Sequence, residues 1–175
     1  MRQFKQMMLP VLSLVLIAFG MTGLLLLVNQ LTAERIQNIM YADLIAAKQE
    51  IFGEVAFTRE DFVMDGENLH YYLVEDDDGY LFLTSVSGYG GNMVVVVGVN
   101  PEGEVVGVQV TEHEETPGLG TRVFDYEFVS QFKVSYTASG FVIGENIDGI
   151  SGSTMTVDAL VLAVNNALAM FREVR

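Results

Sequence analysis

The sequence of 175 residues contains no cysteine. That absence excludes disulfide bonds, thiol catalysis, zinc sites ligated by cysteine and iron–sulfur clusters held by cysteine thiolates. It leaves the compartment open, because an exported domain need not contain disulfides. If this protein carries electrons, an organic cofactor must hold them.

Basic residues are scarce, at nine Lys+Arg against 23 Asp+Glu. Two of the nine, Arg2 and Lys5, lie at the N-terminus, so the chain after residue 28 holds seven basic residues against 23 acids and a net charge of −16. Phosphates of nucleic acids and anionic lipid headgroups repel a domain of this charge. We therefore expect no nucleic acid among the ligands and no binding to anionic headgroups.

One long segment contains no charge at all. Residues 7–28 (MMLPVLSLVLIAFGMTGLLLLV) number 22, and at about 1.5 Å per residue such a helix crosses a hydrocarbon core of roughly 30 Å. A cleaved signal peptide is the alternative, but its apolar region is usually about 7–15 residues long and ends in a small-residue cleavage site. This segment is longer, and no A-x-A pattern follows it.

We therefore predict a retained single-pass anchor at residues 7–28 in the cell inner (cytoplasmic) membrane. Arg2 and Lys5 place residues 1–6 in the cytoplasm by the positive-inside rule. The acidic domain, residues 53–175, then lies on the extracytoplasmic side. Between them, residues 29–52 carry apolar side chains at helical spacing and predict a juxtamembrane helix.

The domain itself alternates between strands and helices, although residues 53–68 are too mixed to assign. The expected strands are residues 69–74, 80–86, 93–99 and 104–111. The expected helices are residues 124–132 and 157–172. The continuous valine run in MVVVVGV predicts burial on both faces of the sheet. We predict an α+β fold with a mainly antiparallel sheet flanked by helices.

Two acidic segments are candidates for a cation site. The EDDDG segment at residues 75–79 suits a solvated turn, because acidic side chains and Gly79 favour turns. His113-Glu114-Glu115 places one imidazole beside two carboxylates without the spacing of a metal site. We therefore predict no metal.

Three segments rich in glycine or hydroxyl groups interrupt the predicted elements. They are Ser87–Gly91 (SGYGG), His113–Gly120 (HEETPGLG) and Asp148–Thr156 (DGISGSTMT). The glycines of the first allow close approach to a ligand but are also what a turn needs, and alone they favour the turn. Pro117-Gly118 marks a turn in the second, in which backbone amides and the Thr116 hydroxyl would face a ligand.

The third segment leads directly into the last predicted helix. It contains four hydroxyl side chains and two glycines. Free backbone N–H groups and the positive end of the helix dipole favour an anion such as phosphate at this position. Helix capping is the alternative, and it needs only one hydroxyl, that of Thr154 or Thr156.

The residues Asp148-Gly149-Ile150-Ser151-Gly152-Ser153-Thr154 resemble the flavinylation motif of FMN-binding domains, in which an Asp leads to Ser/Thr-Gly-Ala-Thr. In that family a flavin transferase attaches FMN through its phosphate to the last threonine, which is Thr154 here. Ser153 stands where the family usually has Ala, so a neighbouring hydroxyl could compete as the acceptor.

Glu115–Gly120 resembles the second signature of the same family, and SGYGG before the valine strand also fits. Within the family the chain is most similar to the G subunits of Rnf-type electron transport complexes, and also similar to the generally longer C subunits of the Na⁺-translocating NADH:quinone reductase. The resemblance implies one covalent FMN, attached to Thr154. The other implied cofactor-binding residues are Asp148, Gly149, Ser151, Gly152, Ser153, Thr116, Gly118, Leu119, Gly120 and Tyr89.

The resemblance also implies a function: an electron-relay subunit of a membrane ion-translocating ferredoxin:NAD oxidoreductase complex. FMN accepts two electrons and releases them one at a time. The implied partners are the other subunits of the complex and, during maturation, the flavin transferase. We assign no catalytic residue, because no nucleophile–base set or paired carboxylates stand out. Two alternatives stay open: a free-standing anchored flavin carrier and an anchored ligand-binding module without a redox role.

Overall fold

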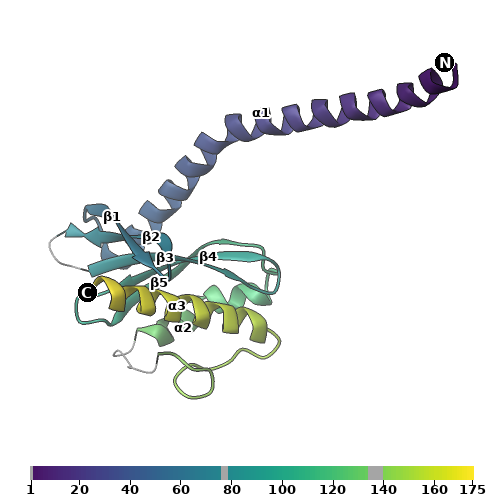
Figure 1. Ribbon diagram of the computed structural model, residues 1–175. Helices are drawn as coiled ribbons and strands as arrows, with labels where there is room; N and C mark the ends of the chain where they lie inside the picture. The colour runs from purple at the N-terminus through teal and green to yellow at the C-terminus, as the bar shows by residue number, and fades with distance from the viewer. Residues whose placement is uncertain (1, 76–78, 134–139) are drawn as a thin grey trace. The chain divides into compact units, whose positions relative to one another are not determined.

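The computed structural model describes residues 2–75, 79–133 and 140–175 of the chain. Its contacts divide the chain into two units, one ending at Ala42 and the other comprising Asp43–Arg175 (Figure 1). The long helix α1, Arg2–Phe52, contributes to both units and includes the predicted juxtamembrane helix. The second unit holds the sheet and the remaining helices.

The first unit contains the apolar stretch of α1. Val11–Thr32 is 22 residues long, has a mean hydropathy of 2.7 and has 0% of that stretch buried. In the described part of the chain one other helix, α3 (Thr154–Val174), is long and apolar enough to cross a membrane, but 61% of it is buried. The N-terminal helix is therefore the segment that could span a membrane, as predicted.

The domain is built on one antiparallel sheet of five strands in the order β1-β2-β3-β4-β5. The strands are β1 (Phe57–Met64), β2 (Glu67–Val74), β3 (Gly79–Ser87), β4 (Asn92–Val99) and β5 (Val105–His113). Both predicted hairpins are present, because β2 pairs with β3 and β4 with β5. The predicted α+β class is confirmed. Of the acidic turn expected between β2 and β3, residues 76–78 lie outside the described residues.

β1 lies at the edge of the sheet and was not predicted. Its residues Arg59, Glu60 and Asp61 are all exposed, so the strand lacks the alternation of apolar and polar side chains that marks a half-buried strand. Charges on an edge strand also hinder pairing with a further strand. The signal for this hairpin was Asp65-Gly66, the two-residue turn to β2, with φ values of 52° and 82°.

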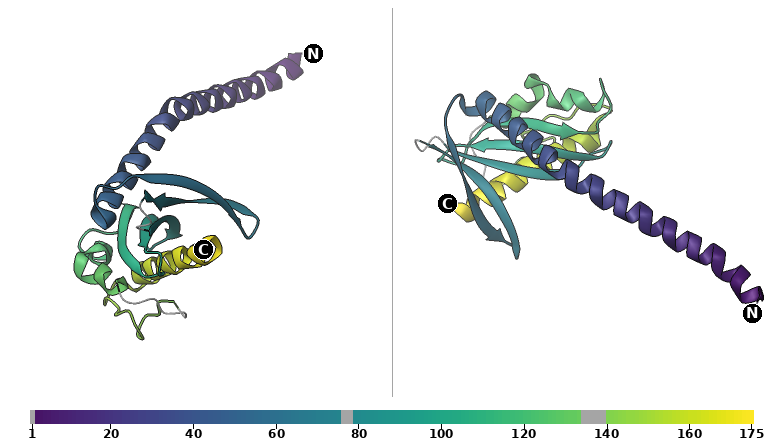
Figure 2. Two further views of the ribbon diagram at one scale, coloured as in Figure 1. Left: turned by 90° about the vertical axis from the view of Figure 1, so that its left-hand side faces the viewer. Right: turned by 90° about the horizontal axis from the view of Figure 1, so that it is seen from above.

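β4 is buried on both faces, as its valine run predicted. Val95 and Val97 belong to the hydrophobic cluster that α3 covers. Val96 points to the opposite face and belongs to a second cluster with Leu44 and Ala47 of α1. Figure 2 shows α3 running alongside the strands. One helix therefore covers each face of β4.

The last turn of α1 packs against two paired glycines of the sheet. Gly98 of β4 lies opposite Gly107 of β5. A Cβ atom at Gly98 would lie 2.5 Å from Ile51 Cγ2, and one at Gly107 would lie 2.8 Å from Ile51 Cγ1. These distances are shorter than any ordinary van der Waals contact. The glycines in the two strands therefore make room for the helix rather than for a ligand.

A buried lysine fixes the end of α1 to the first strand. The Lys48 ammonium donates a hydrogen bond to the Val55 carbonyl oxygen and lies 5.2 Å from the centre of the Phe57 ring. Gly53, with φ of 83°, ends the helix. The end of α1 is thus packed against the rest of the domain.

The predicted helices differ from the observed ones in detail. The short helix expected at residues 124–132 is a series of three turns. They are η2 (Gly120–Phe124), α2 (Tyr126–Val129) and η3 (Ser130–Phe132). The last helix begins at Thr154, three residues before the predicted start at Val157. The prediction followed apolar spacing, which the polar residues of the first turn do not show.

We expect Gly98→Val to lower the free energy of unfolding by about 1–3 kcal/mol, because the added side chain overpacks the site against Ile51. Chemical denaturation of the detergent-solubilised protein, followed by circular dichroism, measures this. In an Ile51→Ala background the same substitution should cost less, because the colliding atoms are gone. An equal cost in both backgrounds would show that this contact is not the cause.

Candidate functional site

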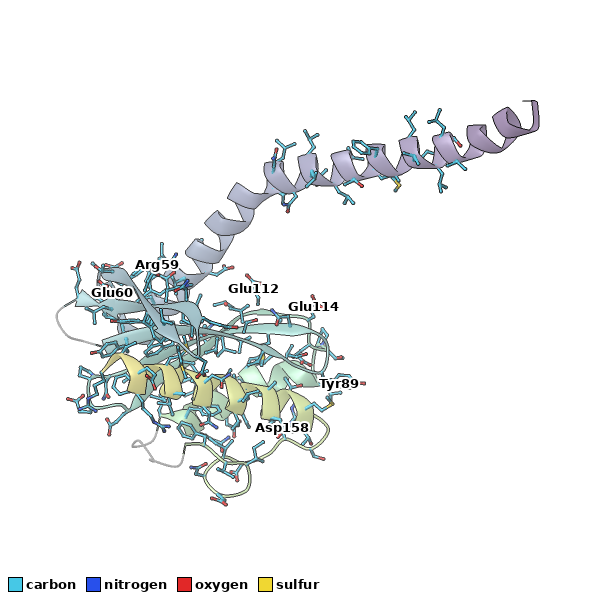
Figure 3. All side chains as sticks on the ribbon, viewed as in Figure 1. Arg59, Glu60, Tyr89, Glu112, Glu114 and Asp158 are labelled. Carbon is cyan, nitrogen blue, oxygen red and sulfur yellow. The ribbon has the colours of Figure 1, made fainter. Side chains whose placement is uncertain are left out.

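A cavity of about 340 Å³ opens beside the first residues of α3. All three segments singled out in the sequence contribute to its wall. Its lining residues are Tyr89, Glu115, Thr116, Leu119, Gly120, Gly152, Ser153, Thr154, Met155 and Thr156. Figure 3 shows Tyr89 and Glu114 at the end of the domain where α3 begins. Seven of the eleven predicted site residues therefore meet at one place.

The turn after β5 presents Leu119 to this cavity. Gly118 has φ of 74°, and its N–H donates a hydrogen bond of 2.9 Å to Thr121 Oγ1. The Leu119 N–H donates to the Thr116 carbonyl oxygen at 3.2 Å. Glycine adopts positive φ at little cost, which explains the Pro117-Gly118 pair. The Leu119 side chain stays exposed in the cavity wall.

Leu119 is held against the segment that leads into α3. The Ser153 hydroxyl donates a hydrogen bond of 2.8 Å to the Leu119 carbonyl oxygen. Gly152 has φ of 85°, and a Cβ atom there would lie 3.4 Å from Leu119 Cδ1. These contacts join the second and third segments, so their positions in the cavity wall are coupled.

The hydroxyl groups of the third segment differ in access. Ser153 is 4% exposed and Thr156 is 1% exposed, whereas Thr154 and Ser151 are exposed. The Ser153 hydroxyl is also engaged with the Leu119 carbonyl. Of the hydroxyls in this segment, that of Thr154 is thus the exposed one that lines the cavity, and Ser153 is poorly placed to compete with it.

The start of α3 carries no side-chain cap. Ser153 is the N-cap residue, and its side chain makes no capping hydrogen bond. The Val157 N–H donates to the Ser153 carbonyl oxygen at 2.9 Å, which opens the helical series. The N–H groups of the three residues before Val157 therefore precede the first intrahelical bond. The capping role left open for Thr154 or Thr156 is wrong, because both lie inside the helix.

The glycine-rich segment between β3 and β4 is organised by a carboxylate. Glu115 Oε1 accepts hydrogen bonds from the N–H groups of Tyr89, at 2.7 Å, and Gly90, at 3.2 Å. The Gly88 N–H donates to the Gly91 carbonyl oxygen at 2.8 Å, so the turn interpretation is confirmed. A Cβ atom at Gly88 would collide with Glu115 Oε1. The missing side chain at Gly88 therefore lets the Glu115 carboxylate approach the backbone closely.

Three lining residues were absent from the predicted set: Glu115, Met155 and Thr156. The sequence suggested Glu115 as a candidate metal ligand beside His113 and as the first residue of the second family signature, but not as a cofactor-binding residue. His113 Nδ1 instead accepts a bond from the Glu115 N–H at 3.3 Å. Within the described ranges, no group of three or more His, Cys, Asp or Glu side chains could hold a metal ion. Met155 and Thr156 were missed because the last helix was predicted to begin at Val157, whereas it begins at Thr154.

Four predicted residues do not line this cavity. Asp148 and Gly149 line a second, polar cavity of about 460 Å³, together with Arg122 and Gln131. The Asp148 N–H donates to Gln131 Oε1 at 2.7 Å. Gly118 and Ser151 line neither of these two cavities. The binding roles of all eleven predicted residues stay predictions.

Comparison with known proteins places the same residues in a known domain. The model of the FMN-binding domain matches residues 88–169, which include the whole lining of the first cavity. The G subunit of the ion-translocating oxidoreductase complex of Shewanella piezotolerans is 30% identical over 193 aligned positions, covering 97% of this chain and 91% of that protein. The chain belongs to the FMN-binding domain family of these G subunits. The resemblance seen in the sequence is thereby confirmed.

Two further relatives are G subunits of the same kind of complex. The protein of Vibrio cholerae is 27% identical over 187 positions, covering 90% of this chain and 86% of the relative. That of Shewanella baltica is 40% identical over 93 positions, covering 48% of this chain and 44% of the relative. The sequence similarity to these G subunits therefore extends beyond the cavity residues to nearly the full chain.

We expect Ser153→Ala to lower the free energy of unfolding by about 0.5–1.5 kcal/mol, because it removes the hydrogen bond to the Leu119 carbonyl. Thermal and chemical unfolding of the flavin-loaded protein measure the change, and the flavin content should not fall. Ser151→Ala is the matched control, since Ser151 is exposed. Loss of flavin from Ser153→Ala with unchanged stability would contradict this assignment.

Proposed function

We propose that this chain carries FMN as a phosphoester on Thr154 and relays electrons within a membrane ion-translocating ferredoxin:NAD oxidoreductase complex of the Rnf type. The observation that carries the proposal is the exposed Thr154 in the wall of a cavity built from all three family segments. The names of the relatives, which are G subunits of an ion-translocating oxidoreductase complex, support the assembly.

The start of α3 suits the phosphate of the cofactor. Backbone N–H groups before the first helical bond and the positive end of the helix dipole both favour an anion. Esterification by Thr154 turns a phosphate dianion into a monoanion, which is easier to hold in the unit Asp43–Arg175, whose net charge is −16. The tether also prevents dilution of the cofactor outside the cytoplasm.

The rest of the cavity suits a flat, largely apolar ring. Tyr89, Leu119 and Met155 are exposed and line the same cavity. Exposed apolar side chains gathered in one concave place commonly mark a ligand site. The volume of about 340 Å³ falls within the roughly 300–1,000 Å³ of small-molecule pockets. The residues present therefore fit FMN.

The chain acts as a relay rather than as a pump. The cofactor supplies the conversion between two-electron and one-electron transfer. Val11–Thr32 contains no charged residue, and ionisable residues inside the membrane are what usually mark an ion path. We place residues 1–6 in the cytoplasm, the anchor in the inner membrane and the domain outside the cytoplasm. The ion path and the sites for ferredoxin and NAD then belong to partner subunits.

Flavin fluorescence of the denatured protein in a gel tests the proposal most directly, because fluorescence that survives denaturation requires a covalent flavin. Its absence would contradict the phosphoester on Thr154. Purification in mild detergent then tests the assembly. Stable membrane partners and ferredoxin-dependent NAD reduction support the complex, whereas a solitary flavinylated protein would favour a free-standing carrier.

Thr154→Ala should abolish the covalent flavin and change the free energy of unfolding by less than about 0.5 kcal/mol. The side chain is exposed and caps no helix, and alanine favours a helical position. Mass mapping of peptides from the unmodified sequence should place the adduct on Thr154. Ser151→Ala, the matched control, should keep the flavin. An adduct on Ser151, Ser153 or Thr156 would contradict the assignment.

Replacing both Gly20 and Gly23 with leucine should release the protein from its complex while the flavin stays attached. Neither glycine has a heavy atom near the position of an added Cβ, and small residues allow close helix–helix approach within membranes. Co-purification of partners and NAD reduction in membranes measure this. Ala18→Leu, about 200° around the helix from Gly20, is the control. Unchanged co-purification of the double variant would make the anchor a passive tether.

A further inference from the structure

One carboxyl group in the wall of the first cavity has an oxygen atom without a partner. Glu115 is 5% exposed. Its Oε1 accepts hydrogen bonds from Tyr89 and Gly90, but its Oε2 is buried and has no hydrogen-bond partner among the described residues. Such groups are rare, because most buried polar atoms are paired.

The surroundings are shaped to keep this carboxylate where it is. A Cβ atom at Gly88 would collide with Oε1, and a Cβ atom at Gly120 would lie 2.5 Å from Oε2. Gly120 and Glu115 both line the cavity. Two separate loops thus carry glycine where any side chain would displace the carboxylate, so its position is part of the cavity's construction.

Two effects follow for a ligand in this cavity. Through Oε1, the carboxylate fixes the backbone of Tyr89, whose side chain lines the cavity. Through its unpaired Oε2, it holds a negative charge in a place that water does not reach. Charges interact more strongly in such surroundings than across solvent.

We propose that Glu115 positions Tyr89 at the cofactor and keeps the reduction potential of the bound flavin low. This inference rests on the proposed function. Two-electron reduction of the flavin ring with uptake of one proton adds one negative charge to the ring, and a fixed carboxylate beside the ring opposes that charge. A low reduction potential makes the reduced flavin a better electron donor to the next carrier.

Glu115→Gln separates the two effects. Glutamine keeps the oxygen that accepts the Tyr89 and Gly90 N–H bonds and removes the charge. The matched control is Glu114→Gln, which removes an equal charge from the adjacent, exposed residue, where solvent screens it.

The experiment is a spectroelectrochemical titration of the full-length protein with its covalent FMN, in detergent. Glu115→Gln should shift the midpoint potential to more positive values and change the visible absorption band of the flavin, while Glu114→Gln stays near the unaltered protein. A purely structural role for Glu115 would leave the potential unchanged. An unchanged potential in Glu115→Gln, or an equal shift in Glu114→Gln, overturns the proposal.

Gly120→Ala keeps the test decisive if Glu115→Gln does not retain flavin. It preserves the charge and displaces Oε2, so it should also move the potential, and a potential equal to that of the unaltered protein overturns the proposal. Covalent flavin missing from the unaltered protein would instead defeat the proposed function. Flavin that is present and insensitive to both variants defeats only the role of Glu115.

Discussion

Burial of β4 on both faces is the constraint on which the domain depends. Its valines cannot face water, so one helix must cover each side. On one side the end of α1 packs into the space left by Gly98 and Gly107. On the other side α3 lies against the sheet and contributes ten of the 24 buried residues of that cluster. The strand thus determines where the end of α1 and α3 lie, and with α3 the place of the first cavity.

The position of α3 has a direct chemical consequence. Its first turn lies beside the loops that follow β3 and β5, so backbone N–H groups face a cavity instead of a cap. The Ser153–Leu119 hydrogen bond then locks one loop to the helix start. Glu115 locks the other loop through Tyr89 and Gly90. Two side-chain contacts therefore assemble three distant segments.

The sequence predicted most of the features that hydrophobic periodicity and short motifs can indicate. The apolar N-terminal helix, both hairpins, the buried valine strand and the segment around Thr154 follow from local patterns. Three features could not be read this way. The exposed, charged edge strand β1 has no periodic pattern of apolar residues. The first turn of α3 has polar side chains and lacks such a pattern too. The glycines of SGYGG are explained only by the contact with Glu115 in the folded chain. The last of these depends on a neighbour that is distant in the sequence.

The charge of the domain raises a last physical question, because an anionic cofactor is proposed for a unit of net charge −16. Exposed charges more than about 8 Å apart are largely screened at physiological ionic strength, so most of the acids contribute little at the cavity. Local groups decide instead. In the proposed arrangement, N–H groups at the start of α3 would attract the phosphate, and the buried Glu115 carboxylate would act on the flavin ring with less screening than an exposed acid. Because both interactions are short in range, separate groups of one cavity would hold the phosphate and tune the flavin potential.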